Sequence, residues 1–322
     1  MSEPALISTI IPVFNRPQMV VRAVGSVLEQ TYRPIEILLV DDGSSDVTPQ
    51  VLADLARQHP EEIRVLSQPN AGPGAARELG RRAARGEFIQ YLDSDDWLYP
   101  NKFLDQITAL RQRPDCAIAY GTTTVSDLEG TIVEPSSRRT GHPMPALFPA
   151  LLTDRWWFVH TPLYRRSICD AVGPWSTMRQ REDWEYDARI GALCPSLVHC
   201  GSVVSNHSHY MSPARASQAS AKACLLYDAI FLPRLFACGL LAGVPLGSAE
   251  MSCFARWAFF RARELDAEGH PEKSSRLLHL SCLSSASTRS SVRLYNLARM
   301  VFRPRAAGWL AERLTALRGG RG

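Results

Sequence analysis

The chain has 322 residues, enough to bury a full core, and its 45% hydrophobic and 21% charged residues are ordinary for a soluble protein. Its eight cysteines are dispersed without a Cys-x-x-Cys pair, which argues against a zinc module and favours reduced thiols in the cytoplasm. The net charge of +4 conceals an asymmetry: residues 1–214 carry 20 Lys/Arg and 25 Asp/Glu, a net of −5, whereas residues 215–322 carry 16 and 7, a net of +9.

Strand and helix patterns alternate along the first 125 residues. Short apolar runs predict strands, and apolar residues at helical spacing predict helices. We expect strands at 6–12, 35–40, 63–66, 88–92 and 117–120, and helices that begin at Pro17, Thr48, Ala75 and near Leu104. This alternation predicts an α/β fold with a mostly parallel sheet flanked by helices on both faces.

The pattern changes in the remaining part of the chain. Residues 122–201 are irregular and rich in proline and aromatic residues. Beyond Pro213 the sequence is typical of helices, which we expect at 219–231, 251–264 and 291–317, the last interrupted by Pro304. The chain therefore predicts one α/β domain followed by a helical extension.

Two acidic segments directly follow predicted strands: DDGSSD at 41–46 and DSDD at 93–96. In an open α/β sheet, ligands bind beyond the carboxyl ends of the strands. Two acidic loops there repel each other unless a cation or a hydrogen-bond donor lies between them. A divalent metal that carries a nucleoside diphosphate supplies the cation, and the base and ribose supply donors, so the segments predict a nucleotide-sugar site. The alternatives are an Asx-type turn at 44–45 and a helix N-cap in the second segment.

Four segments then carry a specific resemblance: IIPVFNR at 10–16, VDDGSSD at 40–46, NAGPGAAR at 70–77 and LDSDD at 92–96. In this order they resemble the nucleotide-sugar-binding half of the family 2 glycosyltransferases, which have the GT-A fold. The match is close over residues 6–125 and loose over 126–212. The resemblance implies a nucleotide-sugar-binding half at 1–125 and an acceptor-binding and catalytic half of the same domain at 126–214. It does not cover the remaining residues, and their charge and helical pattern predict a basic helical extension at 215–322.

The resemblance also implies roles around the donor. It places Pro12 and Phe14 at the nucleobase, Asp42 or alternatively Asp41 at the uracil N–H, and Arg77 at the base or phosphate. It places Asp93 at the ribose and Asp95 at the metal, Mn²⁺ or Mg²⁺, and Ser94 between them is a further nucleotide-binding candidate. Phe14 stands where the family usually has tyrosine, and Glu78 stands where an asparagine often follows the arginine. Plain core packing for Phe14 and a surface position for Arg77 are the structural alternatives.

An acidic pair, Glu182-Asp183, marks the acceptor side. A neutral hydroxyl is a poor nucleophile and needs a base within hydrogen-bond reach. The resemblance implies that Asp183 is this base and that Glu182 orients the site, while a solvated first turn of a helix is the alternative. Trp157 and Trp184 are candidates for acceptor contact because indole faces suit sugar rings, although tryptophans more often pack in cores.

A histidine-containing stretch, HSHYMS at 207–212, resembles a late segment of the same family, with His207 and Ser212 in register. Ser205 stands where an arginine is often found. A neutral imidazole can ligate a metal or hydrogen-bond a diphosphate, so His207 is a second candidate metal ligand and His209 a weaker one. A polar loop without a ligand is the alternative.

The last part of the chain is rich in arginine with interleaved apolar residues, from Arg289 to Arg321. Such helices suit an anionic membrane surface, and a solvated helix face is the alternative. No nucleic-acid motif accompanies the charge, so we expect no nucleic acid. The apolar stretch 229–247 is broken by Pro233 and Pro245 and falls short of the roughly 20 residues that span a bilayer, and the first residues lack an apolar leader. We therefore expect a cytoplasmic protein, peripheral at the inner membrane face.

Together these patterns predict an inverting, metal-dependent glycosyltransferase that moves a sugar from a UDP donor to a hydroxyl of a glycan or lipid-linked acceptor. An oxidoreductase would need Gly-x-Gly-x-x-Gly after the first strand, where the sequence has PVFNR at 12–16. A nucleotidyltransferase would need an early basic phosphate-activating loop, which the sequence lacks. A non-catalytic nucleotide-sugar-binding relative is the remaining alternative.

Overall fold

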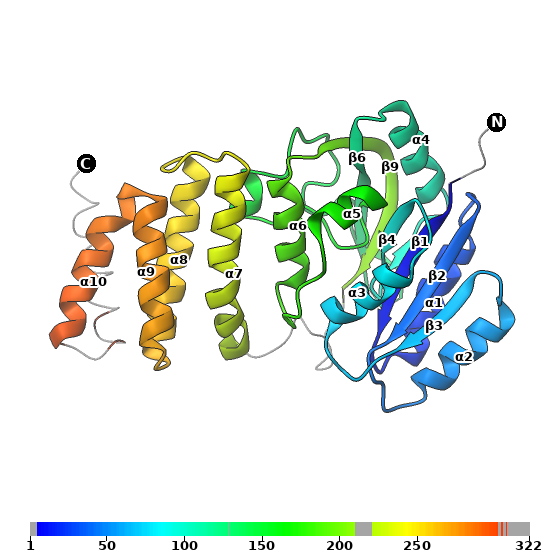
Figure 1. Ribbon diagram of the computed structural model, residues 1–322, viewed down its shortest axis with the longest axis horizontal. Helices are drawn as coiled ribbons and strands as arrows, with labels where there is room; N and C mark the ends of the chain where they lie inside the picture. The colour runs from blue at the N-terminus through cyan, green and yellow to red at the C-terminus, as the bar shows by residue number, and fades with distance from the viewer. Residues whose placement is uncertain (1–4, 128, 210–220, 302–303, 305–306, 308–322) are drawn as a thin grey trace. The chain divides into compact units, whose positions relative to one another are not determined.

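The computed structural model describes residues 5–127, 129–209, 221–301, 304 and 307 (Figure 1). The chain divides into two compact units, which are residues 1–147 with 155–216, and residues 148–154 with 217–322. The first unit contains the sheet, and the second consists of helices. Ser212 and most of the arginine-rich end of the chain lie outside the described residues.

Within the described residues, nine strands form one sheet in the order β3-β2-β1-β4-β8-β6-β9-β5, with β7 beside β6. Their bounds are β1 (Ile7–Val13), β2 (Ile35–Asp41), β3 (Ile63–Ser67), β4 (Phe88–Tyr91), β5 (Trp97–Leu98), β6 (Cys116–Ser126), β7 (Ile132–Glu134), β8 (Leu163–Arg165) and β9 (Ser196–Ser208). The part from β3 to β4 is parallel, β8 is antiparallel to both β4 and β6, and β9 is parallel to β6. The predicted α/β class is confirmed. The antiparallel pairs involve strands from residues 122–201, the part of the chain whose sequence pattern is irregular.

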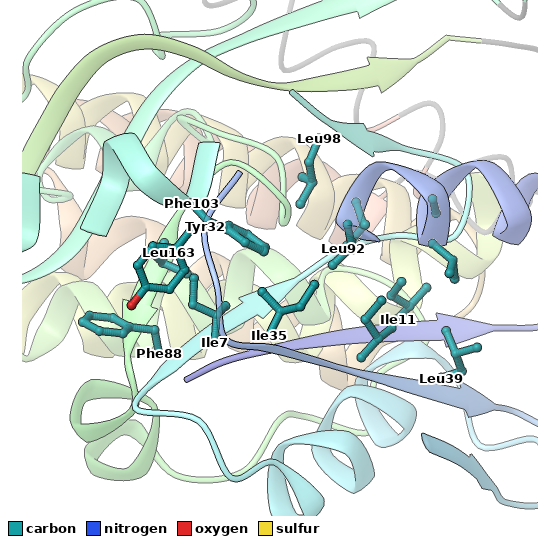
Figure 2. Close-up of a cluster of buried hydrophobic side chains, with 14 of the residues drawn as sticks. Ile7, Ile11, Tyr32, Ile35, Leu39, Phe88, Leu92, Leu98, Phe103 and Leu163 are labelled. Atoms are coloured by element: carbon teal, nitrogen blue, oxygen red, sulfur yellow. The ribbon is translucent and has the colours of Figure 1, made fainter. Parts of the chain in front are cut away.

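Helices cover this sheet. They are α1 (Pro17–Leu28), α2 (Thr48–Gln58), α3 (Pro73–Ala83), α4 (Lys102–Gln112), α5 (Arg166–Val172) and α6 (Glu182–Ala192). All seven residues of β1 and of β2 are buried, as expected for parallel strands with both faces covered. Figure 2 shows part of the core between strands and helices, including Ile7, Ile35 and Phe88.

A glycine brings α3 onto the sheet. A Cβ at Gly80 would lie 2.4 Å from Cγ2 of Ile10, so any larger residue would push the helix away from β1. This close approach of α3 to β1 holds Arg77, one turn earlier on the same helix, beside the tips of the parallel strands.

The second unit contains the short 3₁₀ helices η1 (Ala150–Leu152) and η3 (Ala286–Thr288) and the helices α7 (Ala221–Leu241), α8 (Ala249–Ala267), α9 (Pro271–Ser284) and α10 (Arg289–Val301). In Figure 1, α7 to α10 stand side by side, and α8 packs on both α7 and α9. The sequence did not predict α9, whose apolar residues are spaced less regularly than those of α1.

The expected break of α7 at Pro233 is wrong, because the helix continues through this residue. Its segment Lys222–Leu241 has a mean hydropathy of 1.7, and by length and composition alone it could cross a membrane. A share of 44% of this segment is buried inside the protein. The buried Asp228 is paired with Arg261 of α8 at 2.7 Å, a contact of the kind that ties a helix to its protein neighbours.

Candidate functional site

The structure brings the two acidic segments to the same edge of the sheet. They follow β2 and β4, which flank β1 and run parallel to it. The loop after β1 contacts both segments: the backbone N–H of Asn15 donates to Ser44 Oγ at 3.0 Å, and Arg16 Nη1 lies 2.8 Å from Asp95 Oδ1. The tips of three adjacent strands therefore form one connected site.

The loop after β4 gathers three carboxylates. One oxygen each of Asp93, Asp95 and Asp96 lies within 4.8 Å of the others. Asp95 and Asp96 are buried together with Ser94, whereas Asp93 is partly exposed. Such a concentration of negative charge requires nearby cations, and the guanidinium of Arg16 supplies one.

Asp96 joins this cluster to two histidines that lie far away in the sequence. His160 Nδ1 lies 2.9 Å from Asp96 Oδ2, and His207 Nδ1 lies 3.2 Å from the same carboxylate. The ring of Phe158 stacks on His207 at a centroid distance of 3.9 Å. Burial opposes ionisation of Asp96, but the two imidazoles prevail and hold the pKa of this carboxyl well below its usual range. Asp96 was singled out from the sequence only as part of the DSDD segment, without a role of its own, and His160 was not singled out.

These residues fit a divalent cation. Carboxylate oxygens and an imidazole nitrogen are ligands that Mn²⁺ accepts, and Mg²⁺ favours the oxygens. The described residues offer two candidate groups that share Asp96: Asp93 with Asp95, and His160 with His207. His207 was predicted as a ligand, and its partly exposed ring lies beside the carboxylates. His209, the weaker candidate, is exposed.

The two neighbouring carboxylates after β2 have different surroundings. Asp42 accepts hydrogen bonds from Gln68 Nε2 (2.7 Å) and from the backbone N–H groups of Ala71 and Gly72 (both 2.8 Å). Asp41 accepts one from the backbone N–H of Ser44 at 3.0 Å, three residues along the chain and thus one residue further than in an Asx turn. Asp42, the preferred reader of the uracil N–H, thus accepts three hydrogen bonds from the 68–72 loop, whereas Asp41 accepts one from the loop after β2.

The two residues predicted at the nucleobase lie at the end of β1. Pro12 is buried within the strand, so it shapes the wall of the site. Phe14 exposes 44% of its surface, which excludes plain core packing.

The surroundings of Arg77 differ from the predicted contact with the base or phosphate. Its side chain is only 4% exposed, and its guanidinium pairs with Asp93 at 2.7 Å and with Glu182 at 2.9 Å. It also lies over the ring of Trp175, 4.8 Å from the centroid. Both terminal nitrogens of Arg77 therefore donate to protein carboxylates, and the structure does not support the predicted direct contact with the base or phosphate.

Gly74 allows the ion pair between Arg77 and Glu182. A Cβ at Gly74 on α3 would lie 2.1 Å from the backbone oxygen of Ser176 and 3.4 Å from Cγ of Glu182. The segment before α6 therefore passes directly over the first turn of α3. This close passage brings Glu182, the first residue of α6, within reach of Arg77.

The acidic pair at the start of α6 is held from two sides. Arg155 Nη1 donates to Asp183 Oδ2 at 2.6 Å, and the backbone N–H of Trp184 donates to Asp183 Oδ1 at 2.7 Å. Arg155 Nε donates to Asp187 Oδ2 at 2.8 Å. The side chain of Asp183 is 32% exposed and that of Glu182 is 9% exposed, so Asp183 is the more accessible carboxylate of the pair.

The two carboxyls of the pair have pKa values displaced in opposite directions. Burial, followed by the charge of Asp183, raises the pKa of Glu182 to about 7. Burial also disfavours the charged form of Asp183, but the guanidinium groups of Arg155 and Arg77 prevail and lower its pKa. An accessible, ionised carboxylate beside a carboxyl that titrates near neutral pH is a suitable environment for proton transfer.

The two tryptophans predicted at the acceptor differ. Trp157 is 1% exposed and packs against Tyr120 at a ring-centroid distance of 5.4 Å. It therefore belongs to the core, and its predicted contact with an acceptor is wrong. Trp184 is partly exposed, and the guanidinium of Arg181 lies over its ring. Trp184 remains a candidate for acceptor contact.

Comparison with known proteins identifies a family over the first part of the chain. The family model for glycosyl transferase family 2 matches residues 8–185. The chain is 32% identical over 179 residues to the putative glycosyltransferase EpsH of Bacillus subtilis, covering 53% of this chain and 50% of that protein. It is 37% identical over 128 residues to chondroitin synthase of Escherichia coli, covering 40% and 18%. The chain thus spans about half the length, or less, of these relatives.

Solved structures resemble the described fold over most of its length. TarS residues 1–349 of S. aureus in complex with UDP-GlcNAc has a TM-score of 0.57 at 15% identity and covers 89% of this chain and 90% of that one. The mannosyltransferase PcManGT of Pyrobaculum calidifontis, in complex with GDP-Man and Mn²⁺, has a TM-score of 0.54 at 14% identity and covers 98% and 86%. At these identities the likeness establishes a common fold.

Proposed function

Because this chain belongs to glycosyl transferase family 2, we propose that it transfers a sugar from a nucleotide donor to a hydroxyl of a glycan or lipid-linked acceptor. The observation that carries the proposal is the ion-pair chain Asp93–Arg77–Glu182. It connects the carboxylates at the tips of the parallel strands to the acidic pair at the start of α6. The proposed donor side is thus linked through Arg77 to Glu182, the neighbour of the proposed base Asp183.

The donor would be a UDP-sugar, held by the tips of β1, β2 and β4. The exposed ring of Phe14 would stack on the base, Asp41 would accept the uracil N–H, and the partly exposed Asp93 would meet the ribose. The solved TarS structures with UDP and with UDP-GlcNAc support this class of donor through the shared fold.

A divalent cation, Mn²⁺ or Mg²⁺, would be held by Asp93, Asp95, Asp96 and His207. When bound, it supplies positive charge that stabilises the departing nucleoside diphosphate. The PcManGT complex with GDP-Man and Mn²⁺ supports a metal in a related fold. Arg16 lies against Asp95 and would add charge on the same side.

The acceptor would be activated by Asp183. Its accessible carboxylate would take the proton of the acceptor hydroxyl as the oxygen attacks the anomeric carbon from the face opposite the diphosphate. The bond to the diphosphate breaks as the new glycosidic bond forms, so an α-linked donor gives a β-linked product. Glu182, bound to Arg77, would orient this pair of groups.

The acceptor-bearing surface would be the cytoplasmic face of a membrane. On α10, Leu297 and Met300 expose 61% and 81% of their surfaces, and Arg293 is exposed on the same helix. Apolar side chains beside arginines suit an anionic lipid surface. Cosedimentation with phosphatidylglycerol vesicles, compared with phosphatidylcholine vesicles, tests this docking; equal binding to both or to neither argues against it.

Transfer is tested with the full chain, a panel of nucleotide sugars and Mn²⁺, with NMR assignment of the new glycosidic linkage. A β-linked product from an α-linked donor supports the proposal. Retention of configuration would contradict the single displacement. Tight UDP binding without transfer or hydrolysis of any donor would favour a non-catalytic binding protein.

A further inference from the structure

Arg155 makes two ion pairs with the same face of α6. Its Nη1 binds Asp183 at 2.6 Å, and its Nε binds Asp187 at 2.8 Å. The two carboxylates are four residues apart, one helical turn, so they lie on one side of the helix. The side chains of Arg155 and Asp187 are 7% and 3% exposed, and the Tyr164 hydroxyl also reaches Asp187 at 3.5 Å. Asp187 is therefore a buried anchor for Arg155, while Asp183 is partly open.

The choice of arginine has a geometric reason. A guanidinium is planar and offers several donors in a fixed fork, so it can hold two carboxylates at a defined separation, whereas a lysine ammonium is a point charge on a flexible stem. Arg155 lies in the segment before β8, and Arg77, from α3, holds the other member of the acidic pair. Each carboxylate of the pair thus has its own arginine from a different element.

On the basis of the proposed function, we propose that Arg155 is a positioning residue that fixes the ionised carboxylate of Asp183 toward the acceptor and thereby makes Asp183, and not Glu182, the base. Asp187 acts as the anchor that fixes Arg155. Without Arg155, three neighbouring carboxylates at 182, 183 and 187 would crowd the start of α6, and Asp183 would lose both its orientation and its nearest cation.

The charged groups around Asp183 agree with this role. Glu182 and Asp187 on its own helix raise the cost of its negative charge, as does burial. Arg155, Arg77 from α3 and Arg138 from the segment after β7 oppose them. Arg155 is the largest of these opposing contributions, so its removal affects Asp183 most.

The experiment uses the full chain with Arg155→Met, Arg155→Lys and, as a control, Arg113→Met, which removes an arginine from an exposed ion pair with Asp115. The rate of transfer and the KM for donor are measured from pH 5 to 9. For Arg155→Met we expect kcat to fall about tenfold or more, with an acidic limb moved to higher pH and an unchanged donor KM. Arg155→Lys should restore part of the rate, and Arg113→Met should match wild type.

A second readout does not depend on transfer. Carboxylate ¹³C NMR with labelled aspartate follows the titration of Asp183, whose signal Asp183→Asn identifies. We expect Asp183 to titrate at higher pH in Arg155→Met than in wild type. In Arg155→Lys its titration midpoint should lie between those of Arg155→Met and wild type. A wild-type pH profile and wild-type titration in either folded variant would overturn the role of Arg155. Absence of transfer by wild type would instead overturn the proposed function, and the titration would still decide the role.

Discussion

Asp93 and Glu182, one from a strand tip and one from the start of α6, share the guanidinium of Arg77 at 2.7 and 2.9 Å. They are 89 residues apart in the sequence and belong to the proposed donor and acceptor sides of the site. Because Arg77 and Glu182 are buried and Asp93 is only partly exposed, this link supports the structure of the site as well as its electrostatics.

Arg77→Met leaves Glu182 buried beside Asp183 without its cation. Removal of one partner from a buried ion pair typically costs about 3–5 kcal/mol, so we expect a loss of stability of that order in urea unfolding. Arg82→Met is the matched control on the same helix, since its side chain is 69% exposed and only about 0–1 kcal/mol is expected. Equal destabilisation by the two variants would contradict the described burial of Arg77.

Glu182 should give the fold a pH dependence. Its pKa lies near 7 in the folded protein against an ordinary value of 4.5, because burial and the charge of Asp183 disfavour ionisation. The folded state therefore binds this proton more tightly than the unfolded chain, which stabilises the fold below about pH 4.5, and this contribution is lost as the pH rises to about 7.

The measurement compares the free energy of unfolding of wild type and Glu182→Gln at pH 5 and pH 8. Glutamine keeps an acceptor for Arg77 and removes the titration. Wild type should lose stability relative to the variant over this interval. A relative gain would show that the pKa of Glu182 is lowered in the folded protein.

Gly74→Ala tests the close passage of the segment before α6 over α3. The added Cβ would meet the Ser176 carbonyl oxygen at 2.1 Å, so the segment must move away from Arg77. Overpacking of this kind costs about 1–3 kcal/mol, and we expect lower thermal stability and slower transfer. Gly25→Ala is the control, because no atom lies within 4 Å of its added Cβ and alanine favours a helix by about 0.5–1 kcal/mol. If both variants have the same melting temperature, the contact is not as described.

His207→Ala tests the metal. The thermal stabilisation of the protein is measured as Mn²⁺ is added in the presence of UDP. If His207 is a ligand, the variant should need an Mn²⁺ concentration about tenfold or more above that of wild type to reach the same stabilisation. His209→Ala, two residues along the chain and exposed, should behave as wild type. An unchanged Mn²⁺ requirement in His207→Ala would show that His207 is not a metal ligand and would leave the carboxylates after β4 as the candidate ligands.

The donor side of the site was largely predictable from the sequence. Its residues lie directly after strands whose apolar runs are easy to identify, and parallel strands place their tips at one edge. The strands 6–12, 35–40 and 63–66 and the helix starts at Pro17 and Thr48 agree with the structure within a few residues.

The acceptor side was less predictable because it depends on long-range contacts. Arg155 and His160 lie in a segment without a motif, and only the folded chain brings them to Asp183 and Asp96. The long strand β9 was missed because polar residues and glycine interrupt its pattern.

The corrected residues have physical reasons too. Arg77 was predicted to contact the base or phosphate, with a surface position as the alternative, but Gly74 and Gly80 let α3 approach its neighbours closely enough to bury it. Trp157 is in a segment rich in aromatic residues, where the sequence does not distinguish a core ring from a ring at the acceptor.

The most direct measurement is the single-turnover rate of sugar transfer with Mn²⁺ present, compared between Asp183→Asn and Glu182→Gln. With Asp183 as base, Asp183→Asn should lose about 100-fold or more in rate while UDP binding is unchanged, and Glu182→Gln should lose less. A near-normal rate in Asp183→Asn, or a larger loss in Glu182→Gln, would contradict the account.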